Sequence, residues 1–370
     1  MNNLHGLVFA YRSNKDLREL TQHRNTCSIP FGGRYRLVDF TLSSMVNAGV
    51  TDVGMIVHSS YQSLLDHVGS GKDWDLSRKH GGLRILPPFG YADAPTGDYY
   101  GRMDSLAGVR SYLEDIKQDY VILAGGDIAA NLPVQDIYNQ HLSTKADITA
   151  VVTCQSIGEP RSCTYMSTNP DGRVTDVFVH PKSPMGCEAV EVYLLSKPLL
   201  LSLVDHCAAH NIHSFSDGVI LAMKDRLHIH AYQFDGYVGR FHTLGAYFEH
   251  SMDLLDPAVR TTLFDHRIPI KTKDQCHPSN YYGLEAHASS SLIADGCRVE
   301  GEVDHCILFR GVTVEKGARL SHCILMQGTT VGAGATLQYA ITDKNVLINP
   351  GRMLMGHESY PIAIAKYSKV

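Results

Sequence analysis

The stretch CRVEGEVDHCILFRGVTVEKGARLSHCILMQGTTVGAGATLQYAITDKNVLINPG, residues 297–351, repeats its pattern at a step of seventeen residues. Apolar residues form three columns at this step and glycine forms a fourth: Cys297, Val314, Val331 and Ile348; Val303, Leu320 and Leu337; Ile307, Ile324 and Ile341; Gly317, Gly334 and Gly351. A helix does not keep four such columns in phase, whereas the stacked coils of a β-solenoid do, because each coil buries its inward residues on its neighbours. Three strands per coil, of about six residues each with one deletion, predict a triangular left-handed parallel β-helix.

Two other ladders follow the same repeat. His305, His322 and Tyr339 stand one coil apart, and we interpret them as a stacking ladder rather than as metal ligands. Cys297, Cys306 and Cys323 are expected in the core. A β-sandwich with evenly spaced strands is the alternative fold, but it would not keep a fixed residue in a column. Because the ends and faces of solenoids commonly serve as assembly surfaces, we expect an oligomer.

The first part of the chain has a different pattern, in which short apolar runs alternate with longer amphipathic stretches. Helical spacing occurs in Phe40–Ala48 and Arg102–Ile116, and buried strands are predicted at Leu7–Ala10, Val53–Val57, Tyr120–Leu123 and Ile148–Val152. This alternation favours a mostly parallel α/β sheet with crossover helices. We therefore expect an α/β domain over residues 1–256, an irregular linker over 257–285 and the β-helix over 286–370.

The composition excludes several classes of protein. The chain has 370 residues, a formal charge of -5 and 44% hydrophobic residues, which is typical of a globular two-domain protein without a basic surface for nucleic acid. Its nine cysteines are dispersed and never form a CxxC pair, so we expect neither a disulfide framework nor a zinc site. Neither a signal peptide nor an apolar run of about 18 residues is recognisable. These features predict a reduced cytoplasmic location without membrane contact.

A family resemblance appears in the first domain. Residues 20–24 read LTQHR and residues 29–40 read IPFGGRYRLVDF, a long block that resembles bacterial glucose-1-phosphate adenylyltransferase, the ADP-glucose pyrophosphorylase family. Further stretches continue the resemblance in family order: Trp74-Asp75, Ile85 to Pro88, Gly101 with Asp104, and Leu123 to Gly125. The resemblance covers almost the whole chain. It implies a Rossmann-like, GT-A-like nucleotidyltransferase domain followed by the β-helix.

The residues that carry chemistry in this family are mostly replaced. Its glycine-rich loop, Ala-Gly-Gly-x-Gly-x-Arg-Leu, corresponds here to AYRSNKDL at residues 10–17. Tyr11 and Asn14 bring side chains where the family has bare backbone, and Asp16 would repel phosphate. The remaining family positions have also changed: a lysine is Thr26, a glutamine is Phe89, Gly-Asp is Gly125-Gly126 with the aspartate displaced to Asp127, Glu-Lys-Pro is His180-Pro181-Lys182, and the second metal aspartate is Arg240.

The resemblance therefore implies a degenerate nucleotide and sugar-phosphate pocket, formed by Tyr11, Arg12, Lys15, Gly101, Asp104, Gly125, Gly126, Asp127, His180 and Arg240. We expect no catalytic residue and no cofactor, with Mg²⁺ relevant only to residual catalysis and Asp127 as its weak candidate ligand. Arg12, Lys15 and Arg240 would provide a metal-free phosphate site. The favoured interpretation is that Arg240 pairs with Asp127 or another carboxylate.

The functional expectation is a regulatory, GlgD-type subunit that assembles with a catalytic GlgC-type adenylyltransferase as a homo- or hetero-tetramer in glycogen biosynthesis. It would act allosterically, by favouring the active conformation of its partner. Arg24, Arg34 and Arg36 are candidates for binding a phosphorylated small-molecule effector. Two alternatives stay open: an independently active sugar-phosphate nucleotidyltransferase, and a β-helix acyltransferase, against which the sugar-nucleotide block counts strongly.

Overall fold

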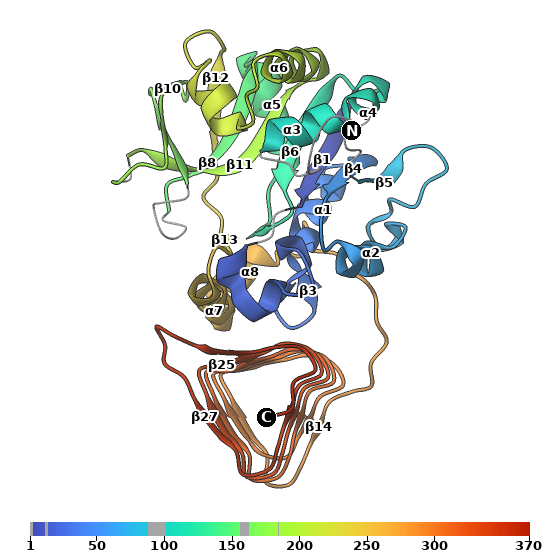
Figure 1. Cartoon of the computed structure of the whole chain (residues 1–370), viewed down its shortest axis with the longest axis vertical. Helices are drawn as coiled ribbons and strands as arrows, with labels where there is room; N and C mark the ends of the chain where they lie inside the picture. The colour runs from blue at the N-terminus through green and yellow to red at the C-terminus, as the bar shows by residue number, and fades with distance from the viewer. Residues whose placement is uncertain (1–2, 12–13, 88–100, 156–162, 184) are drawn as a thin grey trace.

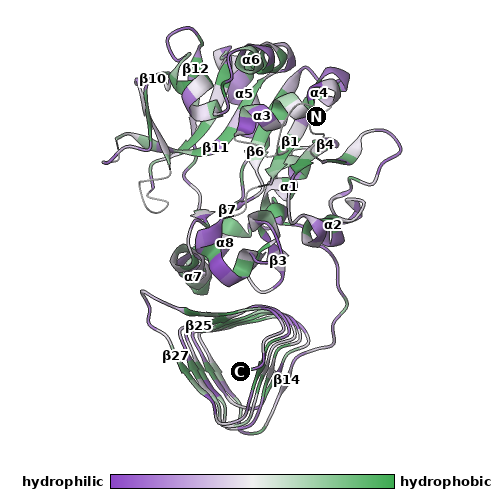
Figure 2. Cartoon of the chain, in the orientation of Figure 1, coloured by the Kyte–Doolittle hydropathy of each residue, from purple (hydrophilic) through white to green (hydrophobic). Residues whose placement is uncertain are grey.

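The computed structural model describes residues 3–11, 14–87, 101–155, 163–183 and 185–370. Figure 1 shows an α/β domain seated on one side of a triangular β-helix, with a linker running down the edge of the molecule between them. Hydrophobic residues are concentrated along the central strands of the α/β domain, as Figure 2 shows. The two-domain prediction is therefore confirmed.

Four parallel strands form one half of the main sheet, in the order β5-β4-β1-β6. They are β1 (Leu4–Ala10), β4 (Asp52–Val57), β5 (Gly82–Leu86) and β6 (Tyr120–Gly125). The central strand β1 is buried along its whole length, as expected for a strand covered on both faces by helices. The apolar runs had predicted three of these strands correctly.

The other half of the sheet is joined through an antiparallel strand that the sequence did not reveal. This long strand, β11 (Cys187–Ser196), lies between β6 and β8 (Ile148–Thr153). Next to β8 lies the parallel strand β12 (Ile229–Gln233), and the antiparallel pair β9 (Thr164–Thr168) and β10 (Val174–Val179) continues from β11. A separate small sheet pairs β7 (Ile128–Ala130) with β13 (Val238–Arg240).

The described α-helices of the first domain are α1 (Leu37–Asn47), α2 (Gln62–Val68), α3 (Arg102–Gly108), α4 (Arg110–Asp115), α5 (Val134–Thr144), α6 (Lys197–Ala209), α7 (Leu244–Met252) and α8 (Pro257–Leu263). The last two, α7 and α8, lie on the side of the domain that faces the β-helix (Figure 1). The helix predicted at Phe40–Ala48 corresponds to α1. The stretch Arg102–Ile116, where helical spacing was noted, is helical but divided in two, because Val109 leaves the helical conformation (φ -116°, ψ 21°) and separates α3 from α4.

The β-helix consists of three parallel five-stranded sheets, as predicted. One sheet contains β14 (Tyr281–Tyr282), β17 (Arg298–Val299), β20 (Thr313–Val314), β23 (Thr330–Val331) and β26 (Leu347–Ile348). The second contains β15 (His287–Ser289), β18 (Glu302–Asp304), β21 (Arg319–Ser321), β24 (Thr336–Gln338) and β27 (Met353–Met355). The third contains β16 (Leu292–Ile293), β19 (Ile307–Leu308), β22 (Ile324–Leu325), β25 (Ala340–Thr342) and β28 (Ile362–Ile364).

The predicted columns hold with one correction. The register pairs Val303 with Leu320 and Leu337, and Val314 with Val331 and Ile348. The partner of Val314 in the preceding coil, however, is Val299 rather than Cys297, because that coil is two residues shorter than the repeat. The glycines at the turns have positive φ, as Gly317 (φ 71°), Gly334 (φ 68°) and Gly351 (φ 68°) show.

The column Ile307, Ile324 and Ile341 does not face the interior of the β-helix. These side chains belong to an apolar cluster that also contains residues of the first domain: Leu17, Leu20, Phe31, Phe40, Tyr247 and Phe248. The neighbouring residues Leu308 and Leu325 belong instead to the solenoid core. One face of the β-helix is therefore apolar on both sides, and the two domains share a continuous hydrophobic junction.

The domain boundaries differ from those predicted. Helix α8 contacts the short 3-10 helix η6 (Asp253–Leu255) and so continues the first domain. The β-helix already begins at β14, so the linker spans residues 264–280. Hydrogen bonds from Lys271 N to Ser43 Oγ (2.8 Å) and from Asn47 Nδ2 to Pro269 O (3.0 Å) hold the linker against α1.

The predicted side-chain ladders are present. The rings of His305 and His322 stack with centroids 5.0 Å apart, and those of His322 and Tyr339 with centroids 4.9 Å apart. Cys297, Cys306 and Cys323 are buried in the solenoid core. Both interpretations of these columns are confirmed.

A disulfide joins Cys154 and Cys187, which contradicts the expectation of unpaired thiols. The register of β8 and β11 pairs Thr153 with Glu188 and so brings the next two residues, Cys154 and Cys187, opposite each other. The spacing of the cysteines could not reveal this, because the two residues are 33 positions apart and β11 itself was not predicted. The other seven cysteines form no disulfide in the described structure.

Candidate functional site

The topology of the sheet places a pocket at the carboxyl ends of β1 and β6. The chain passes from β1 to β4 and β5 on one side and returns through β6 on the other, and such a switch point is where open α/β sheets bind ligands. We call this cavity, with an empty volume of about 300 Å³, the switch-point pocket. Its lining residues are Arg102, Gly125, Asp127, Ile128, Val190, Glu191, Arg240, Phe241 and His242.

Three of the predicted pocket residues meet here. Gly125 ends β6, Asp127 follows two residues later, and Arg240 ends β13 on the opposite wall. A Cβ atom at position 125 would lie 2.5 Å from the Asp127 carboxylate, so a larger residue there would displace that side chain. Gly126 donates its backbone N–H to Phe9 O (3.0 Å) and lies against Cys27 beneath the pocket.

Arg102 is a pocket residue that the sequence analysis missed. It begins α3, is 8% exposed, and its Nη2 lies 3.0 Å from Glu191 Oε2. Its guanidinium also lies over the ring of Phe9, 4.8 Å from the centroid, a favourable cation–π arrangement. The sequence signal for Arg102 was its position between Gly101 and Asp104. Its partner Glu191, however, lies on β11, which the sequence did not reveal.

Arg240 lies beside the carboxylate of Glu188 on β11. Its Nε lies 3.8 Å from Glu188 Oε1, and both side chains are almost completely buried. Its Nη2 also donates to the carbonyl oxygen of Ala189 on the same strand. The cation that stands at the family's metal-aspartate position is thus held by β11, and removing one partner of such a buried pair is costly.

Arginines lie beside the carboxylates near the switch-point pocket. Glu191 Oε2 is 3.0 Å from Arg102 Nη2, and Glu188 Oε1 is 3.8 Å from Arg240 Nε. Within the described ranges, no group of three or more His, Cys, Asp or Glu side chains is arranged to hold a metal. Mg²⁺ usually binds through one or two carboxylates together with substrate phosphates, and the two arginines compete with it for Glu188 and Glu191.

The loop after β1 is built by side chains rather than by glycine. Tyr11 packs its ring edge-on against Phe9, with centroids 6.1 Å apart. Asn14 accepts a hydrogen bond from Asp16 N (3.0 Å) through its side chain and donates one to the carbonyl oxygen of His242. Because His242 lines the switch-point pocket, this contact fastens the loop to the pocket wall.

Gly101 and Asp104 form the start of a helix. Asp104 accepts a hydrogen bond from Gly101 N (3.0 Å) in a capping-box geometry, and its other oxygen lies 2.6 Å from His213 Nδ1. A Cβ at Gly101 would come within 2.2 Å of His213 O. These two residues therefore position α3, and with it Arg102, rather than lining the pocket themselves.

The other predicted pocket residues lie elsewhere. Lys15 is exposed at the start of the 3-10 helix η1 (Lys15–Thr21), and His180 is exposed after β10. Neither lines the switch-point pocket. Arg12 and the position of Phe89 lie outside the described residues.

A second pocket lies between the two domains, and we call it the interdomain pocket. Its empty volume is about 390 Å³, and it lies between the hairpin of β2 (Pro30–Phe31) and β3 (Tyr35–Arg36) and the β-helix. The lining residues are Pro30, Gly33, Arg34, Tyr35, Arg36, His67, Gln275, Phe309, Arg310, Gln327 and Lys344. Gly32 (φ 60°) and Gly33 (φ 81°) form the tight turn of the hairpin.

Four basic side chains converge on the interdomain pocket: Arg34, Arg36, Arg310 and Lys344. Burial and the nearby cations lower the pKa of Lys344 to about 7 and that of Arg36 to about 10. Arg310 is 4% exposed, and its Nε and Nη2 atoms have no hydrogen-bond partner within the described part of the chain. A buried guanidinium with unused donors is suited to an anion.

Arg24 does not belong to the interdomain pocket, which corrects one of the three effector candidates. It is 3% exposed, and its Nη2 donates to both carboxylate oxygens of Asp343 (2.8 and 3.0 Å). Its Nη1 donates to Leu20 O (3.2 Å). Arg24 therefore joins the two domains, while Arg34 and Arg36 line the interdomain pocket, where Arg36 Nη1 also donates to Ser63 Oγ (2.9 Å).

Comparison with known protein families agrees with this arrangement. The family described as "Nucleotidyl transferase" matches residues 13–253, and "GlmU-like, C-terminal hexapeptide" matches residues 279–359. The first match covers well over half of the chain. The chain belongs to the nucleotidyl transferase family. The hexapeptide match supports the left-handed hand of the β-helix.

Named relatives place this nucleotidyl transferase chain more narrowly. "Glycogen biosynthesis protein GlgD" of Bacillus subtilis is 33% identical over 366 residues, which cover 99% of this chain and 96% of the relative. "Glucose-1-phosphate adenylyltransferase" of Geobacillus stearothermophilus is 33% identical over 308 residues, covering 82% of this chain and 79% of the relative. The enzyme of the same name from Bacillus subtilis is 32% identical over 305 residues, covering 81% and 80%. The family resemblance is therefore confirmed.

The helices in the described part of this nucleotidyl transferase are too short or too polar to cross a membrane. None of them combines the length and the apolar character that crossing a bilayer requires.

Proposed function

We propose that this chain is a regulatory subunit with little or no catalysis of its own, acting on a glucose-1-phosphate adenylyltransferase in glycogen biosynthesis. The observation that carries the proposal is the internal neutralisation of the switch-point pocket. Arg102 Nη2 lies 3.0 Å from Glu191 Oε2 and Arg240 Nε lies 3.8 Å from Glu188 Oε1, so each of these two cations has a carboxylate beside it. The full-length similarity to GlgD supports the same role.

The chemistry of the partner reaction explains why this neutralisation matters. Adenylyl transfer from ATP to glucose 1-phosphate, which yields ADP-glucose and pyrophosphate, brings two anions together, and metal ions normally offset their repulsion. A pocket in which carboxylates are committed to arginines offers few oxygen ligands for such an ion. The chain would therefore contribute through contacts with its partner rather than through turnover.

The regulatory action would be a population shift. A subunit that binds the active conformation of a catalytic partner more tightly than the inactive one raises the fraction of active partner. We propose a cytoplasmic hetero-oligomer, a tetramer of this chain and a catalytic adenylyltransferase, as its setting. The shared hydrophobic junction supports this, because the two domains would transmit contacts as one body.

Mixing tests this role directly. The chain alone, a catalytic relative alone and their mixture would be assayed for pyrophosphate release from ATP and glucose 1-phosphate, each with and without sugar phosphates and adenylates. We expect the mixture to exceed the sum of its parts or to respond to effectors differently from the catalytic relative alone. A mixture that equals the sum under every condition would exclude regulation.

An independently active nucleotidyltransferase is the second candidate. The observation that favours it is the position of Asp127, whose carboxylate lies in the switch-point pocket beside Gly125. One carboxylate with substrate phosphates is the minimum ligand set that Mg²⁺ uses in proteins. Magnesium-dependent turnover by the chain alone separates this candidate from the regulatory role.

We further propose that the interdomain pocket binds a phosphorylated effector. The unused donors of Arg310, together with Arg34, Arg36 and Lys344, would bind phosphate oxygens by charge-assisted hydrogen bonds. Because the pocket is lined by both domains, a bound anion would also draw them together. An anion bound at this position would therefore control how the two domains are arranged toward a partner subunit.

The affinity of this pocket for an anion of fixed charge should fall as the pH rises. Lys344 has a pKa lowered to about 7, so its charge is present below pH 7 and is lost above it. We expect sulfate, whose charge does not change over this range, to bind about tenfold more weakly at pH 8.5 than at pH 6, with roughly half a proton taken up per anion near pH 7.5. Calorimetry in buffers of different ionisation enthalpy measures both. Lys344→Arg keeps the charge and should flatten the profile; an unchanged slope in this variant would exclude Lys344 as the cause.

A further inference from the structure

The Cys154–Cys187 disulfide differs from the other cysteines in its exposure. Cys154 is exposed and Cys187 is partly exposed, whereas the seven cysteines outside the disulfide are buried apart from Cys276. Exposed disulfides are the ones that thiols attack readily, and in reducing compartments such bonds are usually transient or redox-sensing. The location of this pair in the sheet shows what its reduction would affect.

The disulfide closes the end of a weakened strand pair. Beyond Ala189 the register of β8 and β11 shifts before pairing resumes at Tyr193, and Glu191 within this irregular segment has a positive φ of 59°. The two residue pairs at the open end, Glu188 with Thr153 and Ala189 with Val152, are thus separated from the main ladder. The covalent bond at the next position holds this short end together.

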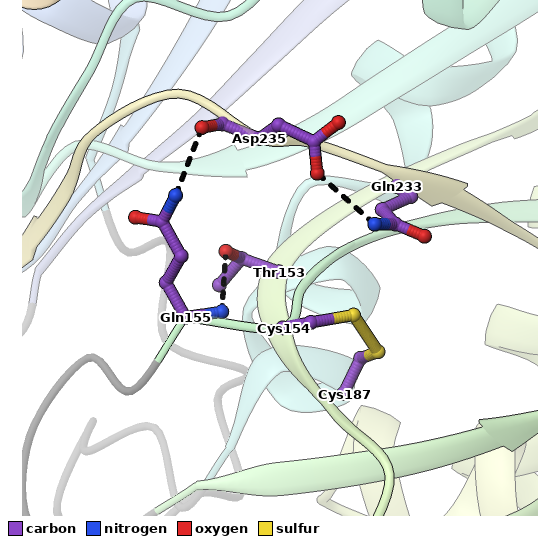
Figure 3. Close-up of a disulfide and its surroundings, with 6 residues drawn as sticks. All are labelled: Thr153, Cys154, Gln155, Cys187, Gln233 and Asp235. Atoms are coloured by element: carbon purple, nitrogen blue, oxygen red, sulfur yellow. Dashed lines mark hydrogen bonds between the residues drawn. A yellow bond between two sulfur atoms is a disulfide. The ribbon is translucent and has the colours of Figure 1, made fainter.

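Each of the two disulfide cysteines is followed in sequence by residues that connect it to Arg240 or to the segment before it. Cys187 directly precedes Glu188 and Ala189, which are the ion-pair partner and a hydrogen-bond acceptor of Arg240. On the other strand Cys154 precedes Gln155, whose side chain donates to Asp235 O (3.0 Å), as Figure 3 shows.

Asp235 lies between the end of β12 and the start of β13, the strand that ends at Arg240. Its carboxylate accepts a further hydrogen bond from Gln233 Nε2 (3.0 Å), which fixes this connection (Figure 3). The disulfide therefore holds the Arg240 wall of the switch-point pocket from two directions, through β11 and through the β12–β13 connection.

We propose that Cys154 and Cys187 form a reversible redox site whose oxidised state holds the Arg240 wall of the switch-point pocket and whose reduced state releases it. The reactant is a dithiol, either a small molecule or a dithiol protein. This inference goes beyond the proposed regulatory function and does not require a partner subunit.

A dithiol reduces the Cys154–Cys187 disulfide in two successive thiol–disulfide exchanges. A thiolate of the dithiol attacks the exposed sulfur of Cys154, and the sulfur of Cys187 leaves as a thiolate that takes up a proton. The second thiol of the reductant then attacks the reductant's other sulfur, the one bonded to Cys154 in the mixed disulfide. Cys154 leaves as a thiolate, which takes up a proton. Two electrons and two protons pass from the dithiol to the cysteine pair, and the reductant becomes a disulfide.

Thiol counting and hydrogen exchange on the full chain test this proposal. Alkylation of the denatured protein followed by mass spectrometry should find seven free thiols after equilibration with oxidised dithiothreitol and nine after treatment with dithiothreitol. Amide exchange of folded protein should become about tenfold faster at residues 187–191 and 238–240 on reduction, because the end of the strand pair then opens locally. Exchange along β1 should not change.

Two variants make the result specific. Cys154→Ser should reproduce the exchange of the reduced protein in both redox states, and Cys276→Ser, at an exposed free cysteine in the linker, should behave as the wild type. Nine free thiols under oxidising conditions, or equal exchange at 187–191 in the two redox states of the wild-type chain, would overturn the proposal. Because neither readout involves a catalytic partner, this result is independent of the mixing assay.

Discussion

Replacing Asp343 with asparagine is expected to lower the free energy of unfolding by about 3–5 kcal/mol. Asp343 is 1% exposed and accepts both hydrogen bonds from Arg24 Nη2 across the domain junction. The substitution leaves the guanidinium of Arg24 buried without its counter-charge, and the interior stabilises an unpaired charge poorly. Unfolding by urea, followed by circular dichroism, measures the loss.

The matched control for this prediction is an exposed ion pair of the same β-helix. Arg298 and Glu300 are 2.7 Å apart at the solvent-exposed surface, so Glu300→Gln should cost no more than about 1 kcal/mol. A double variant with alanine at both Arg24 and Asp343 should lose less stability than the sum of its single variants. Equal losses for Asp343→Asn and Glu300→Gln would show that the junction does not depend on this pair.

Replacing Arg310 with glutamine should weaken phosphate binding in the interdomain pocket by roughly 10- to 150-fold, the effect of losing a charge-assisted hydrogen bond of about 1.5–3 kcal/mol. The same substitution should leave stability unchanged or raise it. Burial already lowers the pKa of Arg310, two of its donors have no hydrogen-bond partner in the described chain, and the nearby carboxylate of Asp295 is 3.9 Å from its Nε, so the unliganded protein gains little from this cation. Calorimetric titration and thermal unfolding measure the two effects.

Arg319 provides the control for Arg310. It is an exposed arginine of β21, 69% accessible, and lies 3.5 Å from Glu302, away from the interdomain pocket. Arg319→Gln should therefore change neither phosphate affinity nor stability appreciably. If both substitutions weaken binding equally, the effect reflects the net charge of the chain rather than a built site.

The β-helix could be predicted from its repeat, whereas the antiparallel part of the sheet could not be predicted. A fixed step of seventeen residues identifies stacked coils from the sequence alone, but the step could not show that the column at Ile324 faces the other domain. A strand that is buried on both of its faces shows no alternation of apolar and polar residues. For this reason β11, with Glu188 and Glu191, escaped notice, and so did the pairing of Cys154 with Cys187.

The candidate sites were predictable where a motif fixed both position and chemistry. Gly125, Asp127 and Arg240 meet in the switch-point pocket because they end strands at one edge of the sheet. Arg24, in contrast, lies in the same motif block as Arg34 and Arg36, yet a buried aspartate of the β-helix binds it. Contacts between distant segments decide such cases, and no local pattern encodes them.

The central claim is that the switch-point pocket is neutralised by its own ion pairs and does not support metal-dependent adenylyl transfer. Pyrophosphate release by the purified chain alone, with Mg²⁺, ATP and glucose 1-phosphate, tests it most directly against a catalytic relative at equal concentration. We predict a rate at least about a thousandfold below that of the relative, because metal clamps and preorganised charges supply most of the rate in such reactions. Turnover within tenfold of the relative, abolished by a metal chelator, would contradict the account.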